Sequence, residues 1–308
     1  MCRSYPQGSI LGPLLFNIFI NDLPLCFKSQ ETNCDMFADD ASIHSADKDM
    51  AVLSARLQKS LEKVEKWCQQ NSMVLHPTKT KAMVIATHRK QQNGQPILNL
   101  SLQGKPVEEV SEHKLLGVII DNELSWKAHT TALCKRLSGK LYTLSKLKLF
   151  LDYDSRKMFV NAHIRCHIDY ASTVWDGCGA GQLSALNSLH RRAAKLILPD
   201  PDISTDQKLQ HIGMLPLKTH LLYNKCIFMY KFWNNRLPKY LSPFFQRSGS
   251  WYGLTHKLFL LPLPRIEMFK SSLSFSGSSA WNQLSITLKS YHTLSKFKSA
   301  LMKSLLED

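Results

Sequence analysis

The clearest hydrophobic pattern in the chain lies between Asp47 and Asn71. Apolar residues recur there every three or four positions, which is the spacing of one face of an α-helix. This apolar face consists of Met50, Leu53, Leu57, Leu61, Val64 and Cys68. Charged residues such as Lys59 and Lys66 lie away from it. We therefore expect an amphipathic helix over residues 47–71.

A shorter helix is expected near the start of the chain. Gly12 and Pro13 suit a helix start, because the missing N–H of proline costs nothing in the first turn. Asp22 to Pro24 would end this helix. Its buried face would be formed by Leu14, Leu15, Ile18 and Phe19.

Several short strands are expected on either side of the long helix. Residues 34–37 and 41–45 would pair as a hairpin with Asp39-Asp40 in its turn, a position that aspartate favours. Further strands are expected over 73–75, 82–86, 97–107 with a turn at Gly104-Lys105, and 114–121 with Gly117 as a bulge or a close backbone approach. Up to about Ile120, these strands predict an incomplete mixed sheet with helices packed on one face.

The remainder of the chain is expected to be mainly helical. Ser125 is a candidate N-cap for a helix whose apolar stripe contains Leu133, Leu137 and Leu141. Further helices are expected over 155–174, 182–198, 217–235 and 295–306. The aromatic stretch from Tyr252 to Leu284 is expected to form short strands, so that its rings would make a small β-rich core. The fold class predicted is therefore α+β.

Charge narrows the range of partners. The chain holds 39 Lys+Arg against 24 Asp+Glu, a net charge of +15, which favours nucleic acid first and an anionic membrane surface second. No acidic residue occurs from Ser125 to Leu151. The cations in that stretch that we expect to contact phosphate backbone are Lys135, Arg136, Lys140 and Lys146. The alternative for these four is an ordinary solvated helix face.

Cysteine usage and hydropathy indicate an intracellular protein. The eight cysteines contain no C-x-x-C pair, so they predict neither a disulfide framework nor a zinc site. The longest apolar run, Ile10 to Ile20, is interrupted and too short to cross a membrane, and no signal-peptide cleavage site comes after it. We expect the protein in the nucleus or the cytoplasm, with no membrane partner.

Four motifs in order identify a family resemblance. Pro6-Gln7-Gly8-Ser9, residues 11–16, Ile20-Asn21-Asp22-Leu23-Pro24 and Phe37-Ala38-Asp39-Asp40 together resemble the reverse transcriptase of jockey-like non-LTR retrotransposons. Residues 67–85 and 113–129, with several later segments, resemble the C-terminal half of that family's polymerases. The resemblance implies a partial polymerase palm over 1–122, a helical thumb or connection over 123–235, and a C-terminal tail over 236–308.

The resemblance also implies roles for single residues. Asp39 would be a direct ligand of Mg²⁺ or Mn²⁺, with Asp40 as its partner. Gln7 and Gly8 would border the incoming nucleotide and the template base. The implied partners are an RNA template and a DNA primer.

Three further positions have implied roles with ordinary alternatives. Phe37 would contact the nucleotide or else pack the hairpin onto the palm. Lys79 would neutralise the leaving pyrophosphate or else be a surface lysine. Leu116 and Gly117 would lie in the primer grip, which holds the primer end by backbone shape.

The family takes a further metal-binding aspartate from a motif before Pro-Gln-Gly. Only Met1 to Tyr5 precede Pro6 in this chain, and none of these residues is acidic. We therefore expect an N-terminally truncated polymerase that is inactive alone and is complemented by an upstream polymerase segment. The alternatives are a non-catalytic nucleic-acid-binding remnant and an unrelated basic structural protein. In the tail, Arg265, Phe269, Phe275 and Trp281 are candidates for stacking on nucleic acid.

Overall fold

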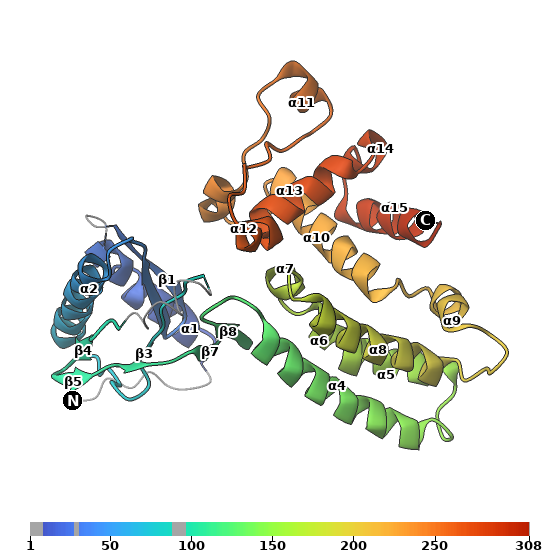
Figure 1. Ribbon diagram of the computed structural model, residues 1–308, viewed down its shortest axis with the longest axis horizontal. Helices are drawn as coiled ribbons and strands as arrows, with labels where there is room; N and C mark the ends of the chain where they lie inside the picture. Colours follow the sequence, from blue (N-terminus) through green and yellow to red (C-terminus); the bar gives the residue numbers. More distant parts are fainter. Residues whose placement is uncertain (1–8, 28–30, 88–96, 308) are drawn as a thin grey trace. The chain divides into compact units, whose positions relative to one another are not determined.

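Two compact units divide the chain, residues 1–113 and residues 114–308 (Figure 1). The computed structural model describes residues 9–27, 31–87 and 97–307. Within these residues no helix has the length and apolar character needed to cross a membrane.

The first unit is organised around α2 (Met50–Gln70). The carboxylate of Asp49 caps this helix by accepting the backbone N–H groups of Ala51 and Val52. One end of α2 packs on Leu98, Leu100, Leu102 and Val107, and the other end on Ile20, Leu23 and Phe27. The other elements of the unit are α1 (Gly12–Ile20), the 3₁₀ turn η1 (Leu23–Phe27), β1 (Thr32–Phe37), β2 (Asp40–Ser45), β3 (Lys81–Ala82), β4 (Ser101–Leu102), β5 (Lys105–Pro106) and β6 (Glu108–Glu109). The long amphipathic helix of this unit is confirmed.

The predicted buried face of α1 is wrong for three of its four residues. Leu14, Leu15 and Ile18 are 57%, 45% and 65% exposed. The helix is held by Phe19, the member of the predicted face that does pack, whose ring meets that of Trp67 edge-on at 5.9 Å, and by buried Ile20. Three leucine and isoleucine side chains of α1 therefore face solvent in the described part of the chain.

The predicted single mixed sheet is also wrong. The described strands form four separate two-stranded sheets, β1-β2, β3-β6, β4-β5 and β7-β8. Residues 73–75 form no strand, and of residues 82–86 only Ala82 belongs to one. The turn predicted at Gly104-Lys105 lies one residue earlier, at Gln103-Gly104, where both residues have positive φ. Two positive φ values suit the tight turn of a two-residue hairpin.

The strand predicted over 114–121 is instead a hairpin of β7 (Glu112–Leu115) and β8 (Val118–Asp121). Its turn is Leu116-Gly117, with φ of +46° and +85°. Gly117 therefore turns the chain and is not a bulge inside one strand.

The second unit is helical, as predicted, with different boundaries. Its helices are α4 (Lys127–Leu147), α5 (Tyr153–Val160), the π-helical turn η2 (Asn161–Arg165), α6 (Cys166–Asp169), α7 (Ser172–Trp175), α8 (Ala180–Ile197), α9 (Thr205–Ile212), α10 (Leu217–Trp233), the 3₁₀ helix η3 (Lys239–Phe244), α11 (Trp251–Thr255), α12 (Glu267–Ser271), α13 (Leu273–Gln283), α14 (Ile286–Lys289) and α15 (Leu294–Glu307). Ser125 is not the N-cap of α4; Trp126 is, and Asp121 accepts the backbone N–H groups of both residues. The helix predicted over 155–174 is broken at Ala171, whose φ is +49°.

The tail is helical where strands were predicted. In the described residues, the only β pairing after Trp233 is a single bridge between Arg247 and Phe259. The rings pack on helices: Trp281 of α13 is fully buried and lies near Tyr230 of α10 and Phe297 of α15. The expected β-rich aromatic core is therefore an aromatic core between helices.

Two hydrophobic cores share α10. Leu217 and Leu221, in its first half, belong to the core built on α4 and α8. Met229 and Tyr230, in its second half, belong to the core of the tail. One continuous helix thus joins both cores of the second unit (Figure 1).

Candidate functional site

Asp39 and Asp40 lie at the tip of a tight antiparallel hairpin, as predicted. Phe37, the last residue of β1, pairs with Asp40, the first residue of β2. The loop between them is Ala38-Asp39, and Ala38 has a φ of +52°. A two-residue loop that begins with positive φ matches the right-handed twist of the strands and fixes their register. The two aspartates are therefore neighbours at a defined point of the backbone.

The hairpin has one covered and one open face. Side chains alternate along a strand, so Cys34, Met36 and Ile43 pack toward the core at the end of α2. Asp40 and Phe37 lie on the other face, and Phe37 is 65% exposed. Packing onto a core was the alternative for Phe37, and the described residues provide no such packing.

The aspartate pair suits a hard divalent cation in donor type. Both residues are exposed, and carboxylate oxygens are the ligands that Mg²⁺ prefers. Within the described residues no group of three or more His, Cys, Asp or Glu side chains is close enough to hold a metal ion. The hairpin therefore presents two carboxylates with room for further ligands.

The other predicted nucleotide contacts are not brought to the aspartates by any contact in the described residues. Lys79 is exposed on a turn, where its backbone N–H donates to the carbonyl oxygen of His76 at 3.0 Å. Gln7 and Gly8 lie outside the described residues.

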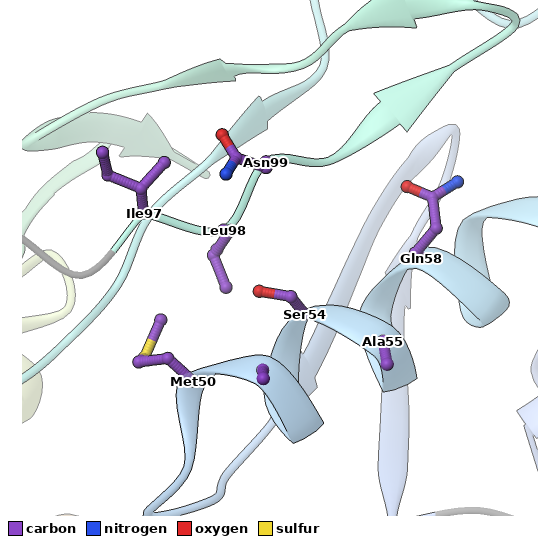
Figure 2. A pocket seen from close by; sticks show the side chains of 8 residues that line it. Met50, Ser54, Ala55, Gln58, Ile97, Leu98 and Asn99 are labelled. Carbon is purple, nitrogen blue, oxygen red and sulfur yellow. The ribbon is translucent and has the colours of Figure 1, made fainter.

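A separate cavity of about 460 Å³ lies beside α2 and contains none of the predicted site residues. Figure 2 shows Met50, Ser54 and Gln58 on α2, facing Leu98 and Asn99 of the neighbouring segment. The Gln58 side chain also accepts the backbone N–H of Ser101 at 2.9 Å. No sequence pattern pointed to this cavity, because its two walls are far apart in the chain.

Leu116 and Gly117, which we predicted to lie in the primer grip, form a turn that contacts Tyr170. The Tyr170 hydroxyl donates to the carbonyl oxygen of Leu116 at 2.6 Å. A Cβ atom on Gly117 would approach the Tyr170 ring to 3.3 Å. Sequence reasoning missed Tyr170, which is 54 residues away from Leu116 and carries no motif of its own.

The basic helix α4 presents its cations to solvent. Lys135, Arg136 and Lys146 are exposed and Lys140 is half-buried. Burial, together with the positive charges of Arg136 and Lys140, lowers the pKa of His167. Two cations of α4 therefore act on a residue of the neighbouring helix α6.

A partly buried polar network that the sequence did not reveal joins α6 and α7 to α10. The Asp169 carboxylate lies 2.5 Å from Nε2 of His220 and accepts the Asn224 amide at 2.9 Å. Burial raises the pKa of Asp169, but the contacts with His220 and Asn224 outweigh it and leave the pKa below its ordinary value. Nearby, Lys225 pairs with Asp176 at 2.7 Å. Burial, acting against the Lys225 charge, raises the pKa of Asp176.

Part of the chain is similar to a known class of enzyme domain. Residues 2–120 match a family model described as "Reverse transcriptase (RNA-dependent DNA polymerase)". The match includes the aspartate hairpin, Lys79 and the Leu116-Gly117 turn. This part of the chain is therefore similar to reverse transcriptases.

Its relatives among known proteins are polymerases of non-LTR mobile elements. The chain is 24% identical over 147 residues to the RNA-directed DNA polymerase from mobile element jockey of Drosophila melanogaster, covering 46% of this chain and 16% of that protein. It is 22% identical over 222 residues to the jockey polymerase of Drosophila funebris, covering 68% and 24%. With the probable RNA-directed DNA polymerase from transposon BS of Drosophila melanogaster the identity is 24% over 210 residues, covering 65% and 23%. The aligned region is thus less than a quarter of the length of each of these relatives.

Proposed function

We propose that this chain is part of the RNA-directed DNA polymerase of a non-LTR retrotransposon, which extends a DNA primer along an RNA template. The observation that carries the proposal is the exposed Asp39-Asp40 pair at the tip of a hairpin, within the residues that match the reverse transcriptase family. The match to the family model makes an unrelated basic structural protein the weakest of the three functions considered.

Asp39 and Asp40 would hold the catalytic cation. When bound, Mg²⁺ or Mn²⁺ would lower the pKa of the primer 3′-hydroxyl and neutralise charge on the transferred phosphate. Lys79 would place a positive charge near the leaving pyrophosphate. Phe37, exposed beside Asp40, offers an apolar surface to the nucleotide, and Gln7 and Gly8 would border the base pair that forms.

We propose that the remaining parts of the site come from polypeptide beyond these 308 residues. Two carboxylates are fewer than a pair of metal ions requires, and the described residues supply no third ligand beside them. Leu14, Leu15 and Ile18 of α1 form an exposed apolar face, which is typical of a surface that packs against another segment. The coverage of the relatives, between 16% and 24%, fits a polymerase with much more chain.

The second unit would hold the nucleic acid. The Leu116-Gly117 turn would place backbone against the primer end. Lys135, Arg136, Lys140 and Lys146 of α4 would contact phosphates without reading sequence. These roles need no metal ion and would persist in a chain that cannot polymerise.

A primer-extension assay on poly(rA) with an oligo(dT) primer and Mg²⁺ or Mn²⁺ tests the proposal. We expect no extension by this chain alone, because the near-attack geometry needs the missing ligands and a nucleotide-holding surface. We expect extension when the upstream part of a related polymerase is supplied by fusion, and its loss in Asp39→Asn. Extension by the chain alone that requires Asp39 would show that the site is complete within it.

A non-catalytic nucleic-acid-binding remnant is the second candidate, favoured by the acid-free basic helix α4. It predicts duplex binding with no extension under any complementation. An upstream fusion that folds and binds primer-template, yet leaves Asp39→Asn and the unaltered chain equally inactive, would support this second function.

A further inference from the structure

A well-anchored arm projects from the tail of the second unit. The arm comprises residues 246–260 and carries α11 at its tip (Figure 1). Its two ends pair, because Ser248 donates its N–H to Leu258 at 2.9 Å and Leu260 donates to Gln246 at 2.8 Å. The arm is thus a closed loop with a defined base.

The base of the arm is fixed to the helical core. The side-chain amide of Asn282 on α13 both accepts the N–H of Phe259 and donates to its carbonyl oxygen, each at 2.9 Å. The indole N–H of Trp281 donates to the carbonyl oxygen of Lys257 at 2.7 Å. Lys289, itself buried, donates to the carbonyl oxygens of Asn282 at 3.1 Å and His256 at 3.5 Å. These bonds hold the arm in one orientation on its own core.

The tip presents aromatic rings to solvent. The Ser250 hydroxyl caps α11 by accepting the N–H of Gly253, so Trp251 and Tyr252 form its first turn. Trp251 is 81% exposed and Tyr252 is 60% exposed. The His256 ring packs on that of Tyr252 with centroids 4.1 Å apart. An anchored base with rings in water at its tip is typical of a binding surface.

The tryptophan at the tip is distinct from the other five in the chain. Four of them, Trp67, Trp126, Trp175 and Trp281, are at most 9% exposed, and Trp233 is half-buried under the Arg247 guanidinium at 4.8 Å. The rings that the sequence offered as candidates for stacking are less exposed: Trp281 is fully buried, Phe275 is half-buried and Phe269 is 37% exposed.

The segment that contains the arm is strongly basic. Residues 236–272 hold six Lys or Arg residues and one acidic residue, Glu267. Lys239, Arg247 and Arg265 are exposed. Open ring faces in a basic segment with almost no acids match a single strand of nucleic acid, whose bases stack on rings while its phosphates are attracted to positive charge.

We propose that the α11 arm binds single-stranded nucleic acid, with bases stacked on Trp251 and Tyr252. Stacking on the arm needs neither a metal ion nor the aspartate hairpin, so the proposal goes beyond the polymerase site. An anionic bilayer is the competing partner, because Leu254, Leu260 and Leu263 are exposed in the same segment. A bilayer would use these aliphatic side chains as much as the rings, whereas stacking uses the rings alone.

Fluorescence quenching of the full chain tests the arm directly. Iodide should quench mainly Trp251, because the other tryptophans are covered. A single-stranded RNA of about 12 nucleotides should quench the same emission and shield it from iodide. Trp251→Ala and Tyr252→Ala should each weaken RNA binding about tenfold, and Trp251→Phe, which keeps a ring, should weaken it less.

Matched controls separate the partners. Leu263→Ala removes a side chain that is 94% exposed but has no ring, so RNA binding should stay within about twofold. Blunt duplex RNA should not shield Trp251, since its bases are not free to stack; single-stranded DNA of the same sequence shows whether the sugar matters. In a variant with Lys135, Arg136, Lys140 and Lys146 of α4 reversed to Glu, single-stranded RNA should still shield Trp251 from iodide. This result would separate a failure of the present proposal from a failure of the polymerase assignment.

Three results would overturn the proposal. The first is unchanged RNA affinity in Trp251→Ala and Tyr252→Ala. The second is an equal loss in Leu263→Ala. The third is shielding of Trp251 by vesicles of phosphatidylcholine and phosphatidylserine but not by RNA, which would make the arm a membrane contact.

Discussion

Tyr170 and Gly117 show how one side chain can determine the shape of a distant turn. The Tyr170 hydroxyl satisfies the carbonyl of Leu116, and its ring fills the space that a side chain at position 117 would need. Gly117 also has a φ of +85°, which other residues adopt only with strain. The turn that we assign to the primer grip is therefore defined by both residues together.

Removing either feature should destabilise the second unit by a measurable amount. We expect Tyr170→Phe to lower the free energy of unfolding by about 1 kcal/mol, the net value of one hydrogen bond. Gly117→Ala should cost more than about 1 kcal/mol, because it adds strain as well as a contact with the ring. Urea unfolding measures both. Tyr142→Phe, on an exposed ring of α4, is the control, and a loss as large as that of Tyr170→Phe would contradict the hydrogen-bond argument.

At the scale of elements, α8 packs on α10 through two histidines. His190 of α8 is 1% exposed and lies ring to ring with His220 of α10, with centroids 6.3 Å apart. Nε2 of His190 donates to the carbonyl oxygen of Leu215 at 2.9 Å, and its Nδ1 is buried without a partner. Burial lowers the pKa of His190 from 6.5 to about 4, so the folded protein holds this ring neutral.

The neutral ring predicts a stability that falls in mild acid. Between pH 6.5 and pH 4 the unfolded chain binds a proton that folded His190 does not, so stability decreases as the pH falls through this range. The contribution is on the order of 3 kcal/mol. The pKa of Asp169 is lowered from its ordinary value of 3.8, so its contribution to stability is lost only at a more acidic pH, as the pH falls below that value.

Urea unfolding between pH 7 and pH 4 tests this. His190→Gln keeps a polar donor but cannot titrate, so its stability should depend less on pH than that of the unaltered protein. His292→Gln, at an exposed site, should leave the dependence unchanged. Parallel profiles for His190→Gln and the unaltered protein would rule out a neutral His190 as the cause.

The elements also show where sequence reasoning succeeded. The helix over 47–71 and the aspartate hairpin were predictable, because a period of 3.6 and a short turn are both local patterns. The strands β3 and β6 were not, since each has two residues and their parallel pairing joins Lys81 to Glu108. Tyr170 and the network of Asp169 with His220 depend on contacts across 50 or more residues, and no local pattern encodes such contacts. The roles of Asp39, Lys79 and the α4 cations remain predictions.

At the scale of the whole molecule, the net charge is +15. We expect four of the positive charges, on α4, to bind the phosphates of a nucleic-acid duplex. Reversing Lys135, Arg136, Lys140 and Lys146 to Glu should weaken binding to RNA–DNA duplex. It should also reduce the slope of log K against log salt by about 3, because fewer counterions are released. Titrations over a range of salt concentrations measure both effects.

A matched control keeps the same change in net charge. Lys59, Lys66, Lys296 and Lys303 are exposed on α2 and α15, outside the surface that we assign to the duplex. Reversing these four should reduce the slope less than reversing the α4 cations. Equal reductions would mean that total charge, and not the surface of α4, determines affinity.

Because α10 contributes to two cores, a copy of the gene that is shortened at its 3′ end should encode an unstable protein. A stop codon between positions 235 and 281 would remove Trp281 and Phe297, which cover the second half of α10. Met229 and Tyr230 would then be exposed on a helix whose first half still belongs to the core of α4 and α8. We expect such a product to aggregate or to be degraded, so a gene copy that loses only its 3′ end would lose the basic helix as well.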